Sequence, residues 1–304
     1  MGKRAFIFPG QGSQYVGMVR DLVENSVEAK EMVQMADDAL GFNLSHIMFN
    51  GPEELLKQTE NTQPAIFLHS VIISSLFRSF SSDMTAGHSL GEYSALVSAN
   101  AIQFYDAIKV VRTRGIEMQN AGKVNPGTMA AVVGLKAEIL NKICNEASAF
   151  GVVQCANFNS PGQIVISGSV DGVRKAMEIS KQKGAKLIKE LVVSGAFHSP
   201  LMEPAISELK KRLDKTNIFD AKIPVYANVT AKPVNKKEEI KKLLVEQLNS
   251  PVRWEETIIN MISDGADEFV EIGPGNVLQG LLKRINPGIK CIGIDRYTDL
   301  EKYL

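Results

Sequence analysis

The sequence is poor in cysteine and has no long apolar run. Its three cysteines, Cys144, Cys155 and Cys291, are odd in number, lie far apart and form no CxxC pair. This pattern argues against a disulfide framework and against a zinc site. No apolar stretch reaches the roughly 18 residues of a membrane span, and no basic start, apolar stretch and cleavage site indicate a signal peptide. We expect a cytoplasmic protein that does not bind membranes.

An excess of charge of either sign is also missing. The 34 lysine and arginine side chains balance 34 aspartate and glutamate side chains, so no overall field favours nucleic acid or an anionic membrane as a partner. Any recognition of charge must therefore be local. With 304 residues, 44% of them apolar and 22% charged, the chain can bury one large core, or a main core and a smaller one.

Both ends of the chain have the pattern of an α/β domain. Apolar runs predict strands at 5–8, 84–86 and 225–229. Helical spacing predicts a helix over 16–40 with a break near Asn25, and further helices over 104–120 and 237–248. Another helix is predicted to begin at the cap candidate Thr62, with Pro64 near its first turn, and another to begin directly after Ser89. The stretch "EFVEIGPGNVLQGLLKRI" predicts a strand, a turn and a helix.

The middle of the chain has a different order of elements. Strands are predicted at 129–133, 152–156, 163–167 and 185–192, helices at 137–149 and 170–183, and "NFNSPG" is predicted to be the central turn. This is the β-α-β-β-α-β order of ferredoxin-like domains. We therefore expect a discontinuous α/β main domain, 1–125 and 195–304, with a small domain at 126–194 inserted into it.

The strongest chemical signal is Gly87-His88-Ser89-Leu90-Gly91, which fits the pattern G-x-S-x-G. In that motif a serine sits on a strained turn between a strand and a helix, and the flanking glycines relieve crowding. The predicted strand before it and helix after it supply this context. We interpret Ser89 as a nucleophile, with a helix-capping serine as the alternative.

A serine hydroxyl becomes a good nucleophile only when a base removes its proton. Among the four histidines, His46 opens a short helix, His69 lies in a very apolar helix, and His88 adjoins the serine but points the other way. His198 follows a predicted strand where the chain leaves the inserted domain. We expect it to be the general base, with a structural loop histidine as the alternative.

Hydrolases with this serine turn place an acid between serine and histidine in the chain. Here Asp106 starts a helix and Asp171 lies in the inserted domain, so both are interpreted as caps or surface charges. The sequence therefore predicts a serine and histidine pair whose imidazole is oriented by a group other than a carboxylate.

Eight ordered blocks along nearly the whole chain resemble malonyl-CoA:acyl carrier protein transacylases of type II fatty acid synthesis. They are "FIFPGQGSQYVGM", "NTQPAIF", "GHSLGEYSAL", "VRTRGIEMQ", "NFNSPGQIVISG", "VSGAFHSPLM", "QLNSPVRW" and "FVEIGPGNVL". The resemblance implies an α/β-hydrolase-like core with a parallel sheet and a ferredoxin-like insert. This agrees with the order of elements predicted above.

The resemblance also assigns backbone groups to the reaction. It implies that the N–H groups of Gln11 and Leu90 form an oxyanion hole, which stabilises the charge on the thioester oxygen. A phosphate loop is the weaker interpretation of "PGQGSQYVG", because the G-x-G-x-x-G register and the Lys-Ser/Thr pair are absent. The main-chain carbonyl of Gln247 is implied to orient the base, and its side chain is expected to be a surface residue at a helix end.

For the acyl group, the resemblance implies that Arg114 binds the malonyl carboxylate, as a planar guanidinium can with two parallel bonds. Helical spacing alone does not decide between Arg114 and Arg112. Phe197 is implied to narrow the pocket, with a core phenylalanine as the alternative. Asn159 is implied to face the thioester or pantetheine arm, with a turn-forming asparagine as the alternative.

The implied activity is malonyl transfer from CoA to the phosphopantetheine thiol of holo acyl carrier protein, by a ping-pong route through a malonyl-serine. It needs no metal and no cofactor besides these substrates. A thioesterase-like serine hydrolase, an acyltransferase of a polyketide pathway and a non-catalytic binding protein are the alternatives.

Overall fold

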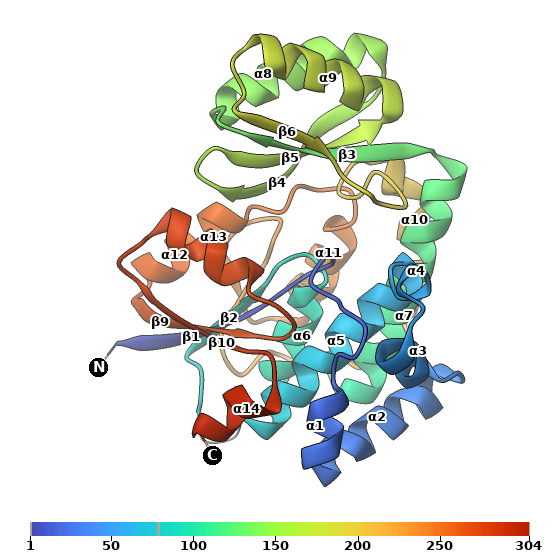
Figure 1. The fold of residues 1–304 in the computed structure, drawn as a ribbon, viewed down its shortest axis with the longest axis vertical. Helices are drawn as coiled ribbons and strands as arrows, with labels where there is room; N and C mark the ends of the chain where they lie inside the picture. Colours follow the sequence, from blue (N-terminus) through green and yellow to red (C-terminus); the bar gives the residue numbers. More distant parts are fainter. Residues whose placement is uncertain (1, 78–79, 304) are drawn as a thin grey trace.

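Two separate β-sheets organise residues 2–77 and 80–303, the part of the chain that the computed structural model describes (Figure 1). The larger sheet has six strands in the order β10-β9-β1-β2-β7-β8. They are β1 (Lys3–Phe8), β2 (Met84–Gly87), β7 (Val225–Tyr226), β8 (Pro233–Val234), β9 (Ala266–Ile272) and β10 (Lys290–Ile294). Every neighbouring pair is parallel except β7 and β8. The fold is therefore mixed α/β with a largely parallel sheet.

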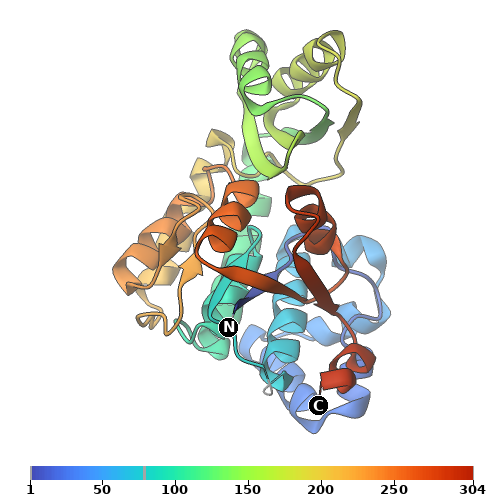
Figure 2. The same cartoon turned by 90° about the vertical axis from the view of Figure 1, so that its left-hand side faces the viewer.

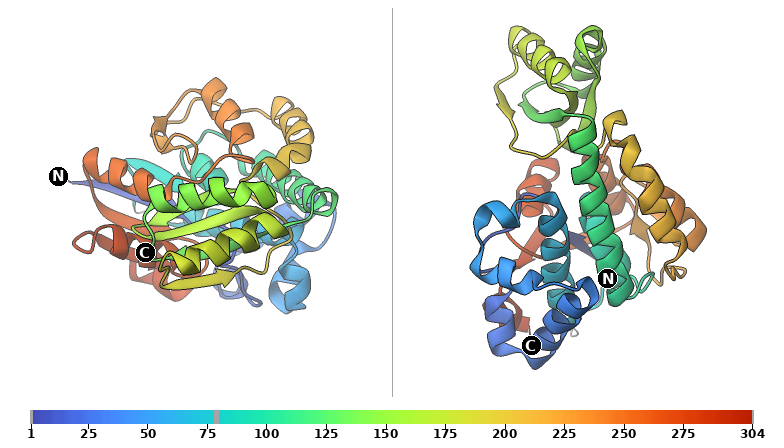
Figure 3. Two further views of the ribbon diagram at one scale, coloured as in Figure 1. Left: turned by 90° about the horizontal axis from the view of Figure 1, so that it is seen from above. Right: turned by 90° about the vertical axis from the view of Figure 1, so that its right-hand side faces the viewer.

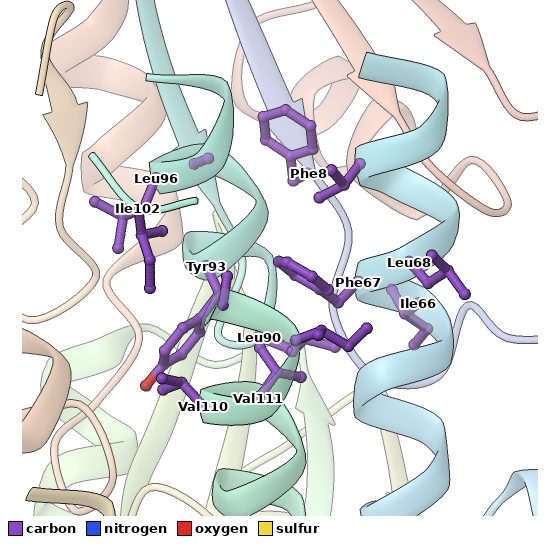
Figure 4. Packing of buried hydrophobic residues seen from close by; sticks show 14 of the residues in the cluster. Phe8, Ile66, Phe67, Leu68, Leu90, Tyr93, Leu96, Ile102, Val110 and Val111 are labelled. Atoms are coloured by element: carbon purple, nitrogen blue, oxygen red, sulfur yellow. The ribbon is translucent and has the colours of Figure 1, made fainter. Parts of the chain in front are cut away.

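Strand β1 lies at the centre of this sheet and is covered on both faces. Phe8 packs in one hydrophobic cluster, and Ile7 packs in a second cluster on the opposite face. A strand with both faces covered needs apolar residues throughout, which explains the uninterrupted run at the start of the chain. Figure 4 shows Phe8 in the first cluster, which also contains side chains of three helices, α5 (Thr59–Leu76), α6 (Gly91–Ser98) and α7 (Phe104–Val124). The second cluster includes side chains of helices α12 (Trp254–Ser263) and α13 (Val277–Ile285).

The remaining helices of this part surround the sheet. They are α1 (Arg20–Asn25), α2 (Val27–Leu40), α3 (Leu44–Asn50), α4 (Glu53–Leu56), α10 (Glu203–Asp214), α11 (Lys237–Glu246) and α14 (Tyr297–Leu300). The break near Asn25 is confirmed, but the helix predicted from residue 16 begins at Arg20, because Gly17 and Val19 adopt left-handed backbone with φ of 95° and 70°. The strand predicted to reach residue 229 ends at Tyr226. Within residues 2–77 and 80–303, no helix has the length and apolar character needed to cross a membrane.

Helix α5 begins earlier than the sequence predicts. Its cap is Gln58, so Thr62 and Pro64 lie inside the helix instead of at its start. A proline has no N–H to donate to the carbonyl four residues before it, which here belongs to Glu60. The Arg112 side chain of α7 donates to that carbonyl through Nη1 and so replaces the missing bond.

The smaller sheet is entirely antiparallel and has the order β4-β5-β3-β6. Its elements are β3 (Gly127–Val133), α8 (Ala137–Ala147), β4 (Val153–Ser160), β5 (Gln163–Ser169), α9 (Val170–Gln182) and β6 (Leu187–Glu190). The predicted order of elements is confirmed. The predicted turn "NFNSPG" is wrong in extent, because Asn157 to Ser160 continue β4 and only Pro161 and Gly162 turn. The strand predicted to end at residue 192 ends at Glu190.

Strand β4 connects the smaller sheet to the rest of the protein. Its Phe158 N–H donates to Val252 O over 2.9 Å, and Val252 N–H donates to Ala156 O over 2.8 Å. Helices α8 and α9 cover the outer face of the smaller sheet (Figures 1 and 2), and α7 runs along the larger part toward it (Figure 3). The inner face of the smaller sheet therefore looks toward the larger part.

Candidate active site

The turn that carries Ser89 joins β2 directly to α6, and glycine makes the turn possible. A Cβ atom on Gly87 would lie 1.9 Å from the carbonyl carbon of Gly91, and one on Gly91 would lie 2.1 Å from Phe8 O. Neither position has room for a side chain. Ser89 itself has a φ of 52°, in the left-handed region that a residue with a side chain rarely adopts. Its N–H is held by Asn228 Oδ1 at 2.7 Å.

The structure brings Ser89 and His198 together although 108 residues separate them in the sequence. Ser89 Oγ lies 2.8 Å from His198 Nε2, and His198 Nδ1 lies 2.8 Å from Gln247 O. Because a carbonyl only accepts, Nδ1 carries the hydrogen and Nε2 is left to accept the serine proton. Burial, and then the Arg114 charge, lower the pKa of His198 to about 3, so the imidazole is neutral at ordinary pH.

Arg114 extends from α7 to the same serine and is only 1% exposed. Its Nη2 donates to Ser89 Oγ at 3.1 Å and to Gln247 Oε1 at 2.9 Å, and its Nη1 donates to Gln63 Oε1 at 2.8 Å. Burial lowers the pKa of the guanidinium. Arg112, the alternative in the sequence, lies on another side of α7 and bonds to Glu60 and Asn61 of α5. The geometry therefore separates two arginines that helical spacing could not.

Gln11 and Leu90 line the cleft that contains Ser89. Within residues 2–77 and 80–303, the backbone N–H of neither residue donates to a protein acceptor. The Gln11 side chain points to Thr59 Oγ1 at 3.3 Å. Glycine also lets the two segments approach each other, because a Cβ on Gly10 would lie 2.5 Å from His88 O.

Two further predicted residues line this cleft. Phe197 is buried, with 6% exposed, and both faces the cleft and belongs to the core. Asn159 also lines the cleft but lies in β4 instead of a turn, which corrects the turn-forming alternative. Its Oδ1 lies 2.8 Å from His88 Nε2, so the residue before Ser89 contacts the smaller sheet and not the serine.

The expectation that the Gln247 side chain is a surface residue is wrong. The residue is completely buried, and its amide bonds to Arg114, to Ser89 O and to Glu92. An amphipathic helix that ends at Glu246 gives no sign that the next residue turns inward.

Sequence reasoning also missed Gln63, Glu92 and Asn228. Gln63 and Glu92 lie in the blocks "NTQPAIF" and "GHSLGEYSAL", so their surroundings were recognised but their side chains were not interpreted. Two signals in the sequence could have indicated these buried polar side chains. Gln63 lies at the start of a very apolar helix, and Glu92 directly follows Gly91, the second glycine of the serine motif. Within the described ranges, no group of three histidine, cysteine, aspartate or glutamate side chains is arranged to hold a metal ion.

Comparison with known proteins agrees with this fold. Residues 5–287 match the family model "Acyl transferase domain", so the class of protein is an acyltransferase. The chain is 48% identical over 304 residues to the malonyl CoA-acyl carrier protein transacylase of Bacillus subtilis, covering 99% of this chain and 96% of that protein. It belongs to the malonyl-CoA:acyl carrier protein transacylase family.

Solved structures give the same result. A transacylase of this name from Coxiella burnetii superposes with a TM-score of 0.96 at 39% identity, over 99% of this chain and 96% of that one. A malonyl-transacylase in complex with a type II PKS acyl-carrier protein superposes with a TM-score of 0.96 at 39% identity, over 99% of each chain.

Proposed function

We propose that this protein transfers a malonyl group from CoA to the phosphopantetheine thiol of acyl carrier protein through an ester on Ser89. One observation carries the proposal: a neutral imidazole and a buried guanidinium meet at one hydroxyl, with His198 Nε2 at 2.8 Å and Arg114 Nη2 at 3.1 Å from Ser89 Oγ. A base next to a serine supports acyl transfer, and a buried cation supports an acyl group that ends in a carboxylate. The names of the relatives support the same activity.

In the first half-reaction His198 Nε2 takes the proton of Ser89 while Oγ attacks the thioester carbon. The charge that develops on the thioester oxygen is stabilised by the N–H groups of Gln11 and Leu90. The carbon–sulfur bond then breaks, and the CoA thiolate receives the proton from His198. The thiol of the carrier protein enters next and reverses these steps, which gives ping-pong kinetics.

Arg114 selects the malonyl group in this proposal. Among the described residues the Arg114 Nε–H has no hydrogen-bond acceptor, and one Nη2–H is directed at Ser89 Oγ. A buried donor without an acceptor is unfavourable, and a carboxylate bound to the guanidinium edge would satisfy it. Phe197 narrows the pocket around the acyl chain, and Asn159 faces the thioester or the pantetheine arm.

We also propose a fold assignment finer than mixed α/β. Residues 126–194 form a ferredoxin-like domain inserted into an α/β-hydrolase-like domain of residues 1–125 and 195–304. The β-α-β-β-α-β order and the antiparallel sheet order β4-β5-β3-β6 support this assignment. The reaction uses no metal or other cofactor besides its two substrates, and we place it in the cytoplasm.

The supply of extender units for fatty acid synthesis is the proposed role. A polyketide pathway is the second candidate, since one structural neighbour is described in complex with a type II PKS acyl-carrier protein. The acyl chemistry is the same in both, so purified carrier proteins of each pathway, tested one at a time, separate them.

The test of the activity is to incubate the protein with malonyl-CoA, with and without holo acyl carrier protein. Release of CoA in step with the formation of malonyl carrier protein supports the proposal. Steady production of free malonate without carrier protein would show a hydrolase instead. Stable binding of malonyl-CoA with no release of CoA would show a binding protein.

A further inference from the structure

Glu92 is a buried carboxylate next to the site that the proposed mechanism does not use. It is the second residue of α6, is 3% exposed and does not line the cleft. Its Oε2 accepts from Gln247 Nε2 at 2.8 Å and from the Asn228 N–H at 3.0 Å. Glu92 therefore touches neither the acyl group nor Ser89 Oγ, but it touches two residues that do touch the site.

The bond to Gln247 determines which way that amide faces. Gln247 Nε2 has two hydrogens, and both are used, on Glu92 Oε2 at 2.8 Å and on Ser89 O at 3.1 Å. A carbonyl and an ionised carboxylate accept but do not donate. The nitrogen must therefore face these two oxygens, and the Gln247 carbonyl oxygen must face Arg114, where it accepts from Nη2 at 2.9 Å.

Charge supports the same arrangement. Arg114 is a buried cation, and the attraction of Glu92 helps to keep the pKa of its guanidinium from falling further. Burial raises the pKa of Glu92 to about 7, while its bonds from Asn228 and Gln247 and the nearby Arg114 charge favour the ionised form. A carboxylate at this place is costly to bury, and its partners are the groups that offset the cost.

We propose that Glu92 is a positioning residue that fixes the Gln247 amide, and through it the Arg114 guanidinium, in the orientation that binds the malonyl carboxylate. This inference rests on the proposed function of the site. A second arm, from Glu92 through Asn228 to the Ser89 N–H, steadies the serine turn. Loss of the second arm lowers transfer of every acyl group by a similar factor, whereas loss of the first arm lowers malonyl transfer more than acetyl transfer.

The test measures the ratio of kcat/KM for malonyl-CoA to kcat/KM for acetyl-CoA, because a merely structural role lowers both values by the same factor. Glu92→Ala removes the acceptor, and we expect the ratio to fall roughly tenfold to a hundredfold, as for other charge-assisted hydrogen bonds in a buried site. Glu92→Gln keeps one oxygen that can accept both bonds, and we expect a ratio within about threefold of the wild type. An equal loss with both thioesters, or no rescue by glutamine, would overturn the inference.

Two further variants keep this test decisive. Glu92→Asp keeps the charge but withdraws the oxygen from Gln247, so it carries the test if Glu92→Ala does not fold, and the ratio should fall again. Glu271→Ala is the matched control, since Glu271 is also a completely buried glutamate, but it binds the N–H groups that begin α13. It should change malonyl and acetyl transfer by the same factor. Failure of the wild type to transfer malonyl would refute the proposed function itself, and is thereby distinguished from failure of the Glu92 inference.

Discussion

The proposed site has two parts, a reactive end at Ser89 and a recognition end at Arg114, and the two are built in different ways. At the reactive end, a strained backbone turn that glycines on either side make possible places the half-buried Ser89 in the cleft. At the recognition end, Arg114 is held by the side-chain oxygens of two amides, Gln63 and Gln247. The serine turn is formed by five consecutive residues, whereas the surroundings of Arg114 come from three separate segments, α5, α7 and the end of α11.

This difference teaches that chemistry and selectivity can fail separately. A change at the serine turn alters the nucleophile for every acyl group. A change around the guanidinium should weaken the binding of a carboxylate most, and transfer of an uncharged acyl group less, because only the carboxylate forms charge-assisted bonds to the guanidinium. The variants below are chosen to separate the two ends, or to show that they cannot be separated.

The largest effect is expected at the reactive end. Ser89→Ala removes the only atom that can carry the acyl ester in the proposed mechanism, so malonyl and acetyl transfer should both fall at least about a thousandfold. The measurement is carrier-dependent release of CoA from each thioester. Retention of more than a tenth of the wild-type rate with either thioester would rule out Ser89 as the nucleophile.

The recognition end should respond to acyl identity. Arg114→Ala removes a charge-assisted bond to the malonyl carboxylate, and malonyl kcat/KM should fall about a hundredfold while acetyl kcat/KM changes less than about tenfold. Arg112→Ala is the control. It removes the donor to the Glu60 carbonyl, which Pro64 cannot replace, so it should lower the stability of the protein without changing the malonyl preference. If Arg114→Ala lowered malonyl and acetyl transfer by the same factor, Arg114 would not be selective for the carboxylate, and the two ends could not be separated.

The backbone origin of the reactive end can be tested without touching a reacting atom. Gly91→Ala places a methyl group 2.1 Å from Phe8 O, and we expect a loss of about 3 kcal/mol in the free energy of unfolding, with loss of both transfers. Gly280→Ala in α13, where a Cβ meets nothing within 4 Å, should leave stability within about 1 kcal/mol of the wild type, in the stabilising direction. Chemical denaturation of both variants measures the difference, and similar stabilities would contradict the steric argument.

The smallest effect concerns pH. Burial and the Arg114 charge lower the pKa of His198 to about 3, so the base stays neutral as the pH falls from 8 to 5. Acetyl transfer, which does not need the carboxylate site, should therefore change less than about twofold from this group over that range. Glu92, with a pKa of about 7, titrates in the same range, so the measurement is repeated with Glu92→Gln. A loss of kcat/KM centred near pH 6.5, the ordinary value for histidine, in both the wild type and Glu92→Gln would show that the imidazole is not held as the geometry indicates.

The reactive end and the order of elements could be predicted from the sequence because their signals are local. The turn motif, the apolar run of β1 and each predicted strand and helix of the smaller domain lie within a short stretch of consecutive residues. Thr62 and Pro64 misled the prediction for the start of α5, because the compensating donor, Arg112, comes from a distant helix.

The recognition end could not be predicted from local pattern. Gln247 follows an ordinary surface helix, and Glu92 is a charge in the first turn of a helix, which usually faces solvent. Their burial depends on contacts between segments more than 100 residues apart. Only the resemblance pointed to Arg114, and only the fold showed what holds it.

The most direct test of the account is a crystal structure of the protein after reaction with malonyl-CoA in the absence of carrier protein. We predict an ester on Ser89 Oγ, with the terminal carboxylate hydrogen-bonded to the Arg114 guanidinium and His198 Nδ1 still bonded to Gln247 O. An ester on another side chain, or a carboxylate turned away from Arg114, would contradict it.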